Sequence, residues 1–124
     1  ARNIGYLAPY ISTISEKMCF LLEDDGFDIG AAATFGEGRD SIVGCIHPQS
    51  ILDAIDAIIS SATIPLDAIF ISCTSLKCAT IIAIAESQFG IPVISSNSAI
   101  AWDMARLARL AMPANEKGLL FQQD

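Results

Sequence analysis

The sequence has few basic side chains and only one histidine. Seven Lys and Arg residues stand against fourteen Asp and Glu residues, so the formal net charge of the 124-residue chain is −7 at pH 7. The basic residues form no cluster, whereas binding to nucleic-acid phosphates or to an anionic membrane surface requires one. The charge pattern therefore argues against both kinds of partner.

Long apolar runs are also absent. No segment approaches the roughly 18 uncharged apolar residues that a membrane-spanning helix needs. The opening residues "ARNIGYLAPY" lack the basic start and the long apolar stretch of a secretory signal peptide. Apolar residues make up 52% of the chain and charged residues 17%, which is typical of a globular domain. We expect one cytoplasmic domain.

The sequence offers no metal-binding pattern. The four cysteines are Cys19, Cys45, Cys73 and Cys78, and no two of them have Cys-x-x-Cys spacing. His47 has no second ligand at metal-binding spacing, so we expect no metal site and interpret His47 as a loop residue. The segment "GEGRDSIVG" lacks the ending of a phosphate-binding loop, and no G-x-S-x-G motif is present. Nothing marks the chain as secreted, so we expect reduced thiols.

Four apolar segments predict buried strands, and a helical pattern follows each of them. The strand segments are "NIGYLA", "FDIGAAATF", "LDAIFIS" and "IPVISS". The helical segments are "ISTISEKMCFLLEDDGF", "SILDAIDAIISSA", "KCATIIAIAESQFG" and "SAIAWDMARLARLAM". This alternation predicts parallel strands with right-handed crossovers, and hence an α/β fold. We expect a four-stranded parallel sheet in the order 2-1-3-4, with helices on both faces.

The pattern indicates one domain and a short tail. Residues 1–112 are expected to form a single α/β lobe, whereas residues 113–124 show no clear period. The segment "SIVGCI", which contains Cys45, resembles a strand. Apolar residues at helical spacing line one face of the first two helices. They are Ile11, Ile14, Met18, Leu21 and Leu22 in the first, and Ile51, Leu52, Ile55, Ile58 and Ile59 in the second.

Small and polar residues follow each predicted strand. In open parallel sheets, ligands bind beyond the carboxyl ends of the strands, where loops lead into helix N-termini. Four segments take this position: residues 8–10, 36–44, 72–75 and 95–97. The fold therefore gathers a tyrosine, a cysteine, several hydroxyl groups and an amide along one edge of the sheet.

Cys73 is the strongest candidate for a catalytic residue at this edge. We expect it at the N-terminus of the third helix, where unpaired N–H groups and the helix dipole lower the pKa of a thiol and can hold a carboxylate. A thiolate there suits proton abstraction next to a carboxylate, or addition to an activated double bond. The alternative is a small buried thiol that packs as an apolar side chain. Its position alone supports both interpretations equally.

The other candidates also have two interpretations. Tyr10 either donates a hydrogen bond to an anion or packs on the edge of the sheet. Cys78 falls on the same predicted helix as Cys73 and is expected to fill the core. Cys19 and Cys45 are expected to be structural.

Two long segments carry a family resemblance. "RNIGYLAPYISTISEKMCFLLEDDGFDI" and "FISCTSLKCATIIAIAESQFGIPVISSNSAIAWDMARLA" resemble the Asp/Glu/hydantoin racemase superfamily. Within it, the chain is similar to the branch that holds maleate cis-trans isomerase, arylmalonate decarboxylase and the ectoine-utilisation racemase-like protein. The resemblance covers about residues 2 to 110, and its motifs are specific when taken together in order and spacing.

The resemblance implies a two-lobed enzyme without metal or organic cofactor. Each lobe is a four-stranded parallel sheet flanked by helices, and the active site lies in the cleft between the lobes. A cysteine from each lobe works on a small carboxylate substrate, either as acid and base or as nucleophile and proton donor. Racemisation, cis-trans isomerisation and decarboxylation all remain open as the reaction.

Individual positions match the family motifs. Cys73 matches the cysteine of the second lobe, Tyr10 the tyrosine that hydrogen-bonds the substrate carboxylate, and Thr74 the residue whose backbone N–H helps to bind it. Asp40 stands where maleate isomerases usually carry an asparagine, and it would repel a substrate carboxylate unless Arg39 pairs with it. Ser96, which follows the fourth strand, is a further candidate substrate contact.

The chain opens on the first strand of the second lobe, so the resemblance implies a C-terminal catalytic lobe that lacks its N-terminal partner lobe. Such a lobe should have little activity alone. The alternative is a non-catalytic half-domain that binds a small anion, with an inert Cys73.

A lone lobe is also expected to expose an apolar patch and to form a homo-oligomer, most simply a symmetric dimer. The patch is expected around Pro9, Tyr10 and Leu76, with the tail residues Leu119, Leu120 and Phe121 either joining it or docking.

Overall fold

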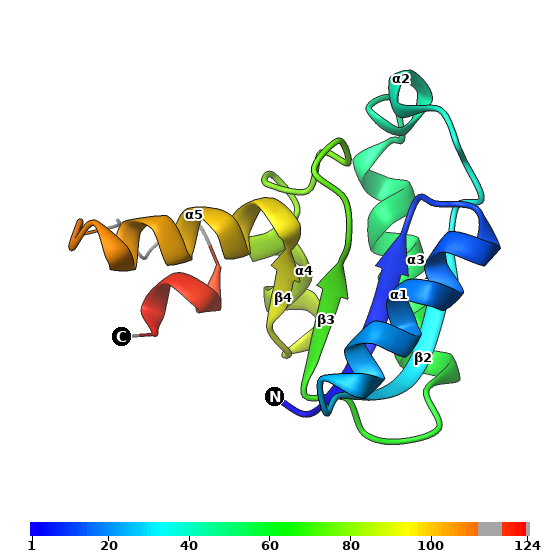
Figure 1. Cartoon of the computed structure of the whole chain (residues 1–124), viewed down its shortest axis with the longest axis horizontal. Coiled ribbons are helices and arrows are strands. Elements are labelled where there is room, and N and C mark those ends of the chain that lie inside the picture. Colours follow the sequence, from blue (N-terminus) through cyan, green and yellow to red (C-terminus); the bar gives the residue numbers. More distant parts are fainter. Residues whose placement is uncertain (112–117, 124) are drawn as a thin grey trace.

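The computed structural model describes residues 1–111 and 118–123 and contains one four-stranded sheet (Figure 1). Its strands are β1 (Asn3–Ala8), β2 (Asp28–Thr34), β3 (Ala68–Ile71) and β4 (Val93–Ser95). All neighbouring strands are parallel, and their order is β2-β1-β3-β4. The predicted topology is therefore confirmed.

Helices lie on both sides of this sheet. They are α1 (Ser12–Asp24), α2 (Asp40–Val43), α3 (Pro48–Ser61), α4 (Ile82–Phe89), α5 (Ser96–Leu107) and the 3-10 helix η2 (Leu119–Gln122). In Figure 1, α1 covers one face of β1 and β2, α3 and α4 lie behind the sheet, and α5 projects away from β4. Along the described ranges, no helix is both long and apolar enough to cross a membrane.

The hydrophobic core lies between the sheet and helices α3 and α4. Ile51, Ile55 and Ile58 of α3 are buried against Leu7 of β1 and Ile69 of β3. The apolar face predicted for α3 is thus the face that packs on the sheet. Burial of each such side chain contributes roughly 1.5–3 kcal/mol to the free energy of unfolding.

Helix α1 differs from α3 because its apolar residues are poorly covered. Ile11, Ile14 and Leu21 are exposed, whereas Ser15 is the buried residue of this helix. The side of α1 that faces the sheet is not the side that carries its apolar residues. The helical spacing of apolar residues therefore does not identify the buried side of this helix.

The predicted position of the exposed apolar patch is wrong. Pro9 and Leu76 are fully buried rather than exposed. Most of the exposed large apolar side chains lie instead on or beside α1 and α5, where Met104 and Leu107 are 65% and 68% exposed.

The third predicted helix is shorter than its sequence pattern. Helix α4 begins at Ile82, and residues 72–81 form a loop between β3 and α4. Leu76 and Cys78 are buried in the core, which draws the loop inward before the helix starts. Cys73 therefore does not lie in the first turn of a helix, and Cys78 lies in the loop rather than on the helix.

The segment around Cys45 also differs from its prediction. "SIVGCI" does not form a strand, because its first residues belong to the short helix α2. Val43 of this helix is buried in the core, whereas Cys45 is exposed.

The last described residues contact α5 and β4, and a buried carboxylate on α4 also holds them. Glu86 of α4 accepts a hydrogen bond from the N–H of Val93 at 2.9 Å and from the N–H of Leu119 at 2.8 Å. Docking of this part of the tail is therefore confirmed. Pro113, where the tail was predicted to begin, lies outside the described residues.

Gly5 marks the tightest packing in β1. A Cβ atom there would lie 2.6 Å from side-chain atoms of both Ile58 and Ile69. We expect Gly5→Ala to lower the free energy of unfolding by about 1–3 kcal/mol, because overpacking forces the core to shift. Urea unfolding of the chain measures this. The control is Gly38→Ala, whose Cβ would have its nearest contact at 3.8 Å; equal losses for both variants would contradict the packing described.

Candidate active site

The structure brings the predicted site segments together at one edge of the sheet. Tyr10 follows β1 and Cys73 follows β3, and these two strands are adjacent and parallel. The pairing continues beyond the strands, because the N–H of Ser72 donates a hydrogen bond to the carbonyl of Leu7 at 2.8 Å. Ser96 joins them as the first residue of α5.

Cys73 has an unusual backbone conformation. Its φ angle is 150°, a value that residues with a side chain rarely adopt. Its N–H donates a hydrogen bond to the Ser96 hydroxyl at 3.2 Å, and its sulfur accepts one from the N–H of Ser75 at 3.3 Å. The cysteine is 5% exposed. Backbone strain of this kind costs about 1–3 kcal/mol and clusters at functional sites.

Thr74 presents a backbone donor beside this cysteine. Its carbonyl accepts a hydrogen bond from Asn97 Nδ2 at 2.9 Å, which ties the loop to the start of α5. Within the part of the chain that the structure describes, the Thr74 N–H has no hydrogen-bond partner. Thr74 is exposed, so this N–H group is available to an anion.

Tyr10 is a proton donor next to Cys73. Burial and then the interaction with Cys73 raise the pKa of Tyr10 above its ordinary value, and the charge of Asp40 adds to the rise. The phenol therefore stays protonated at neutral pH and can donate a hydrogen bond. The Thr34 hydroxyl at the end of β2 donates to the Tyr10 carbonyl and holds its backbone.

Asp40 lies near Tyr10 but does not pair with Arg39. The Arg39 guanidinium binds Glu37 instead, with an Nε to carboxylate distance of 2.9 Å. Asp40 is exposed, and it forms no salt bridge among the described residues. Pairing with Arg39, the condition under which Asp40 would not repel a substrate carboxylate, is therefore not met in the structure.

The remaining thiols differ from Cys73. Burial, and then the nearby Cys73, raise the pKa of the Cys78 thiol to about 12, so Cys78 is protonated at neutral pH. This agrees with its interpretation as core filler. Burial also raises the pKa of Cys19. The exposed Cys45 thiol donates to the Ser41 carbonyl at 3.3 Å.

His47 is a helix cap. Its Nδ1 atom accepts a hydrogen bond from the N–H of Gln49 at 3.1 Å, at the N-terminus of α3. Among the described residues, no group of three His, Cys, Asp or Glu side chains is arranged as metal ligands would be.

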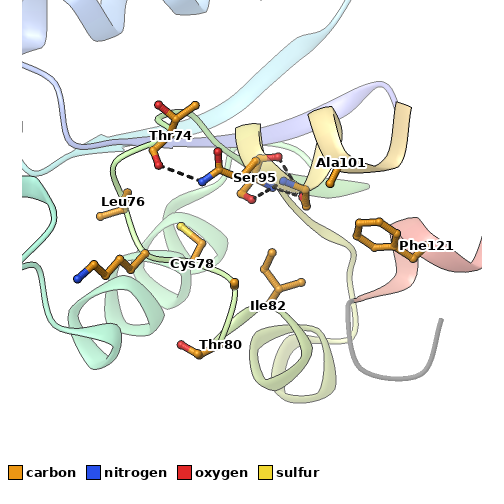
Figure 2. Close-up of a pocket in the computed structure, with 12 residues that line it drawn as sticks. Thr74, Leu76, Cys78, Thr80, Ile82, Ser95, Ala101 and Phe121 are labelled. Carbon is orange, nitrogen blue, oxygen red and sulfur yellow. Dashed lines mark hydrogen bonds between the residues drawn. The ribbon is translucent and has the colours of Figure 1, made fainter. Parts of the chain in front are cut away.

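A cavity lies beside the part of the Cys73 loop that carries Thr74, Leu76 and Cys78 (Figure 2). It has a volume of about 460 Å³, and Thr74, Cys78, Ile82, Ala101 and Phe121 are among the residues that line it. Neither Cys73 nor Tyr10 lines this cavity. Of the site residues predicted from the sequence, Thr74 alone lines this cavity.

The sequence placed Ser72 and Asn97 at this edge only as members of the segments 72–75 and 95–97, and it did not single out Tyr6. In the structure, Asn97 fixes the Thr74 carbonyl, and Ser72 and Tyr6 are buried. The signal for Tyr6 was available, because a phenol within an apolar strand needs a polar partner.

Comparisons with known proteins agree with this geometry. A family model described as arylmalonate decarboxylase matches residues 1–121. The maleate isomerase of Nocardia farcinica (strain IFM 10152) is 30% identical over 125 residues, which is 100% of this chain and 49% of that protein. The chain therefore spans about half the length of this relative.

Solved structures also match this chain over about half of their length. A variant of the Nocardia farcinica maleate cis-trans isomerase with a covalently bound succinylcysteine intermediate matches with a TM-score of 0.90 and 28% identity, over 100% of this chain and 50% of that one. An arylmalonate decarboxylase crystal structure matches with a TM-score of 0.86 and 23% identity, over 99% of this chain and 54% of that one. At this identity the match supports the fold alone. The chain belongs to the arylmalonate decarboxylase family and has the fold of one lobe of these enzymes.

Proposed function

We propose that the chain is a catalytic lobe of a cofactor-independent racemase or isomerase, in which Cys73 acts as acid or base on a small carboxylic or amino acid. The observation that carries the proposal is the environment of the Cys73 sulfur. Its backbone is strained, its sulfur accepts the N–H of Ser75, and the Tyr10 phenol lies beside it. A core-filling cysteine needs none of these features.

Two donors are placed to hold the substrate carboxylate. The Thr74 N–H and the Tyr10 hydroxyl both lie next to Cys73, and neither donor carries a positive charge. Hydrogen bonds to a charged carboxylate are stronger than those between neutral groups, so these two donors can bind the substrate carboxylate throughout the reaction. Ser96 does not bind the substrate in this proposal. Its hydroxyl accepts a hydrogen bond from the Cys73 N–H and so holds the backbone of the loop in place.

Cys73 alone does not complete a racemisation. Inversion at carbon removes a proton from one face and delivers a proton to the other, so it requires a second acid or base opposite Cys73. The related maleate isomerase is about twice as long as this chain. A partner lobe that supplies the second group accounts for this difference in length, and this lobe alone is then nearly inactive.

Asp40 restricts the substrate. Because Arg39 is engaged by Glu37, a second substrate carboxylate near Asp40 would meet uncompensated negative charge. A substrate with one carboxylate, or with an amino group next to it, avoids this repulsion. The proposal therefore favours amino-acid racemisation over isomerisation of a dicarboxylate such as maleate.

Replacement of Cys73 tests the proposed reaction. In the full-length protein, Cys73→Ser should lower kcat by about 10²–10⁴-fold, because a serine hydroxyl is a far weaker acid or base. The measurement is an assay panel of amino acids, arylmalonates and maleate, with Cys45→Ser as the control that keeps activity. Wild-type protein that binds small carboxylates but turns over none of them would instead favour the anion-binding module.

Replacement of Tyr10 tests carboxylate binding. Tyr10→Phe should raise KM about 10- to 100-fold and leave kcat nearly unchanged, because it removes a hydrogen bond to a charged group in both the ground and transition states. Steady-state kinetics with the substrate found in the panel measures this. An unchanged KM would place the carboxylate elsewhere.

The exposed side of α5 is where we expect a partner lobe, or in its absence a second copy of the chain. Ile100, Met104 and Leu107 lie at helical spacing along it and are all more than half exposed. The isolated chain should therefore self-associate, and Met104→Glu should shift it toward monomer in sedimentation velocity. Ile84→Glu on α4 is the control at another exposed apolar position. A wild-type chain that stays monomeric across the concentration series would contradict this.

A further inference from the structure

The first two residues of α5 both hold the backbone of the Cys73 loop. The Ser96 hydroxyl accepts a hydrogen bond from the Cys73 N–H at 3.2 Å. Asn97 Nδ2 donates one to the Thr74 carbonyl at 2.9 Å, and a dashed line at Thr74 marks this bond in Figure 2. The partners in each bond are 23 residues apart in the sequence, so both contacts join separate elements of the fold.

The bond from Asn97 acts on a peptide group that also contacts the Cys73 sulfur. The peptide group between Thr74 and Ser75 carries the Thr74 carbonyl and the Ser75 N–H. Among the described residues no peptide bond is cis, so this carbonyl and this N–H point in opposite directions within one plane. The Ser75 N–H donates to the Cys73 sulfur at 3.3 Å. Asn97 holds the carbonyl end of the group and thereby sets the direction of its N–H end.

The preceding peptide group, between Cys73 and Thr74, is held from both sides. Ser96 fixes the peptide group before it, through the Cys73 N–H, and Asn97 fixes the one after it. The N–H of this central group belongs to Thr74, which finds no hydrogen-bond partner for it in the described part of the chain. Because both neighbouring groups are fixed, this N–H keeps one direction and stays available to a ligand. The strained backbone of Cys73, with its φ angle of 150°, persists only where surrounding contacts hold it.

The helix itself does not require Asn97. Ser95 already caps α5, because its side chain accepts the Ser98 N–H at 3.1 Å and its own N–H donates to the Ser98 hydroxyl at 2.9 Å. Asn97 is exposed, so it fills no space in the core, and asparagine is a weaker helix former than alanine. The hydrogen bond to the Thr74 carbonyl is therefore the contact that accounts for an asparagine at this position.

We propose that Asn97 is a positioning residue of the candidate active site, which directs the Ser75 N–H to the Cys73 sulfur and the Thr74 N–H to the substrate carboxylate. This inference rests on the proposed function, because that function gives the sulfur and the Thr74 N–H their roles. Asn97 acts through the backbone of the loop and does not itself bind the substrate.

Amide hydrogen exchange tests the geometry without a substrate. In the full-length protein, Asn97→Ala should make the Ser75 amide exchange about three- to tenfold faster, because its peptide group is no longer held against the sulfur. NMR measures the exchange rate of each amide. The matched control is Asn3→Ala, since Asn3 Nδ2 also donates to a backbone carbonyl, that of Pro65 at 3.3 Å, at the beginning of β1. It should leave the Ser75 exchange rate unchanged.

Kinetics separate positioning from a merely structural role. With the substrate found in the assay panel, Asn97→Ala should raise KM and lower kcat, each about three- to tenfold, because one loop N–H binds the carboxylate and the other contacts the sulfur. Partial unfolding would reduce only the amount of active enzyme, so it would lower the apparent kcat and leave KM unchanged. The melting temperature should stay within about 4 °C of the wild-type value, because the lost hydrogen bond is exposed. Asn3→Ala should keep both kinetic constants.

The possible results are distinct. A wild-type exchange rate of the Ser75 amide in Asn97→Ala, a wild-type KM, or a marked loss of stability would each overturn the positioning role. If Cys73→Ser keeps full activity, the proposed function fails whatever the exchange rate shows. If Cys73→Ser is inactive while Asn97→Ala matches the wild type, only this inference fails.

Discussion

The parallel pairing of β1 with β3 is the contact on which the candidate site depends. It sets Leu7 opposite Ile71, and the next hydrogen bond, from the Ser72 N–H to the Leu7 carbonyl, carries the register past the end of the strand. Because side chains alternate across a sheet, a shift of one residue would turn the buried side chains of β3 to the other face. The core side chains of both strands exclude that shift, and the same register brings the loops that carry Tyr10 and Cys73 together.

The loop after β3 presents N–H groups where the first turn of a helix was expected. Leu76 and Cys78 are buried and delay the start of α4 until Ile82, so Cys73 does not begin α4; the helix that starts beside it is α5, whose first residue Ser96 accepts the Cys73 N–H. The Ser75 N–H donates to the Cys73 sulfur, and the Thr74 N–H has no hydrogen-bond partner among the described residues. A fixed loop of this kind presents donors in specific directions, whereas a dipole acts along an axis.

The sequence allowed a parallel sheet to be predicted because apolar strand segments alternate with helical segments along the chain. It also placed Tyr10, Cys73 and Ser96 at one edge, since parallel strands all end on the same side. It did not predict the loop, because Cys78, Ile81 and Ile82 stand at helical spacing and all three are buried in the core, yet the helix begins only at Ile82. Position alone also could not reveal the strain at Cys73 or the salt bridge that removes Arg39 from Asp40.

The candidate site and the cavity lined by Phe121 are two separate places where a ligand could bind, because neither Cys73 nor Tyr10 lines that cavity. The most direct measurement is a crystal structure of the full-length protein with a bound small carboxylic acid. The account predicts carboxylate oxygens within hydrogen-bond distance of the Thr74 N–H and the Tyr10 hydroxyl, with the Cys73 sulfur facing the adjacent carbon. A ligand in the cavity lined by Phe121, out of reach of Cys73, would contradict it.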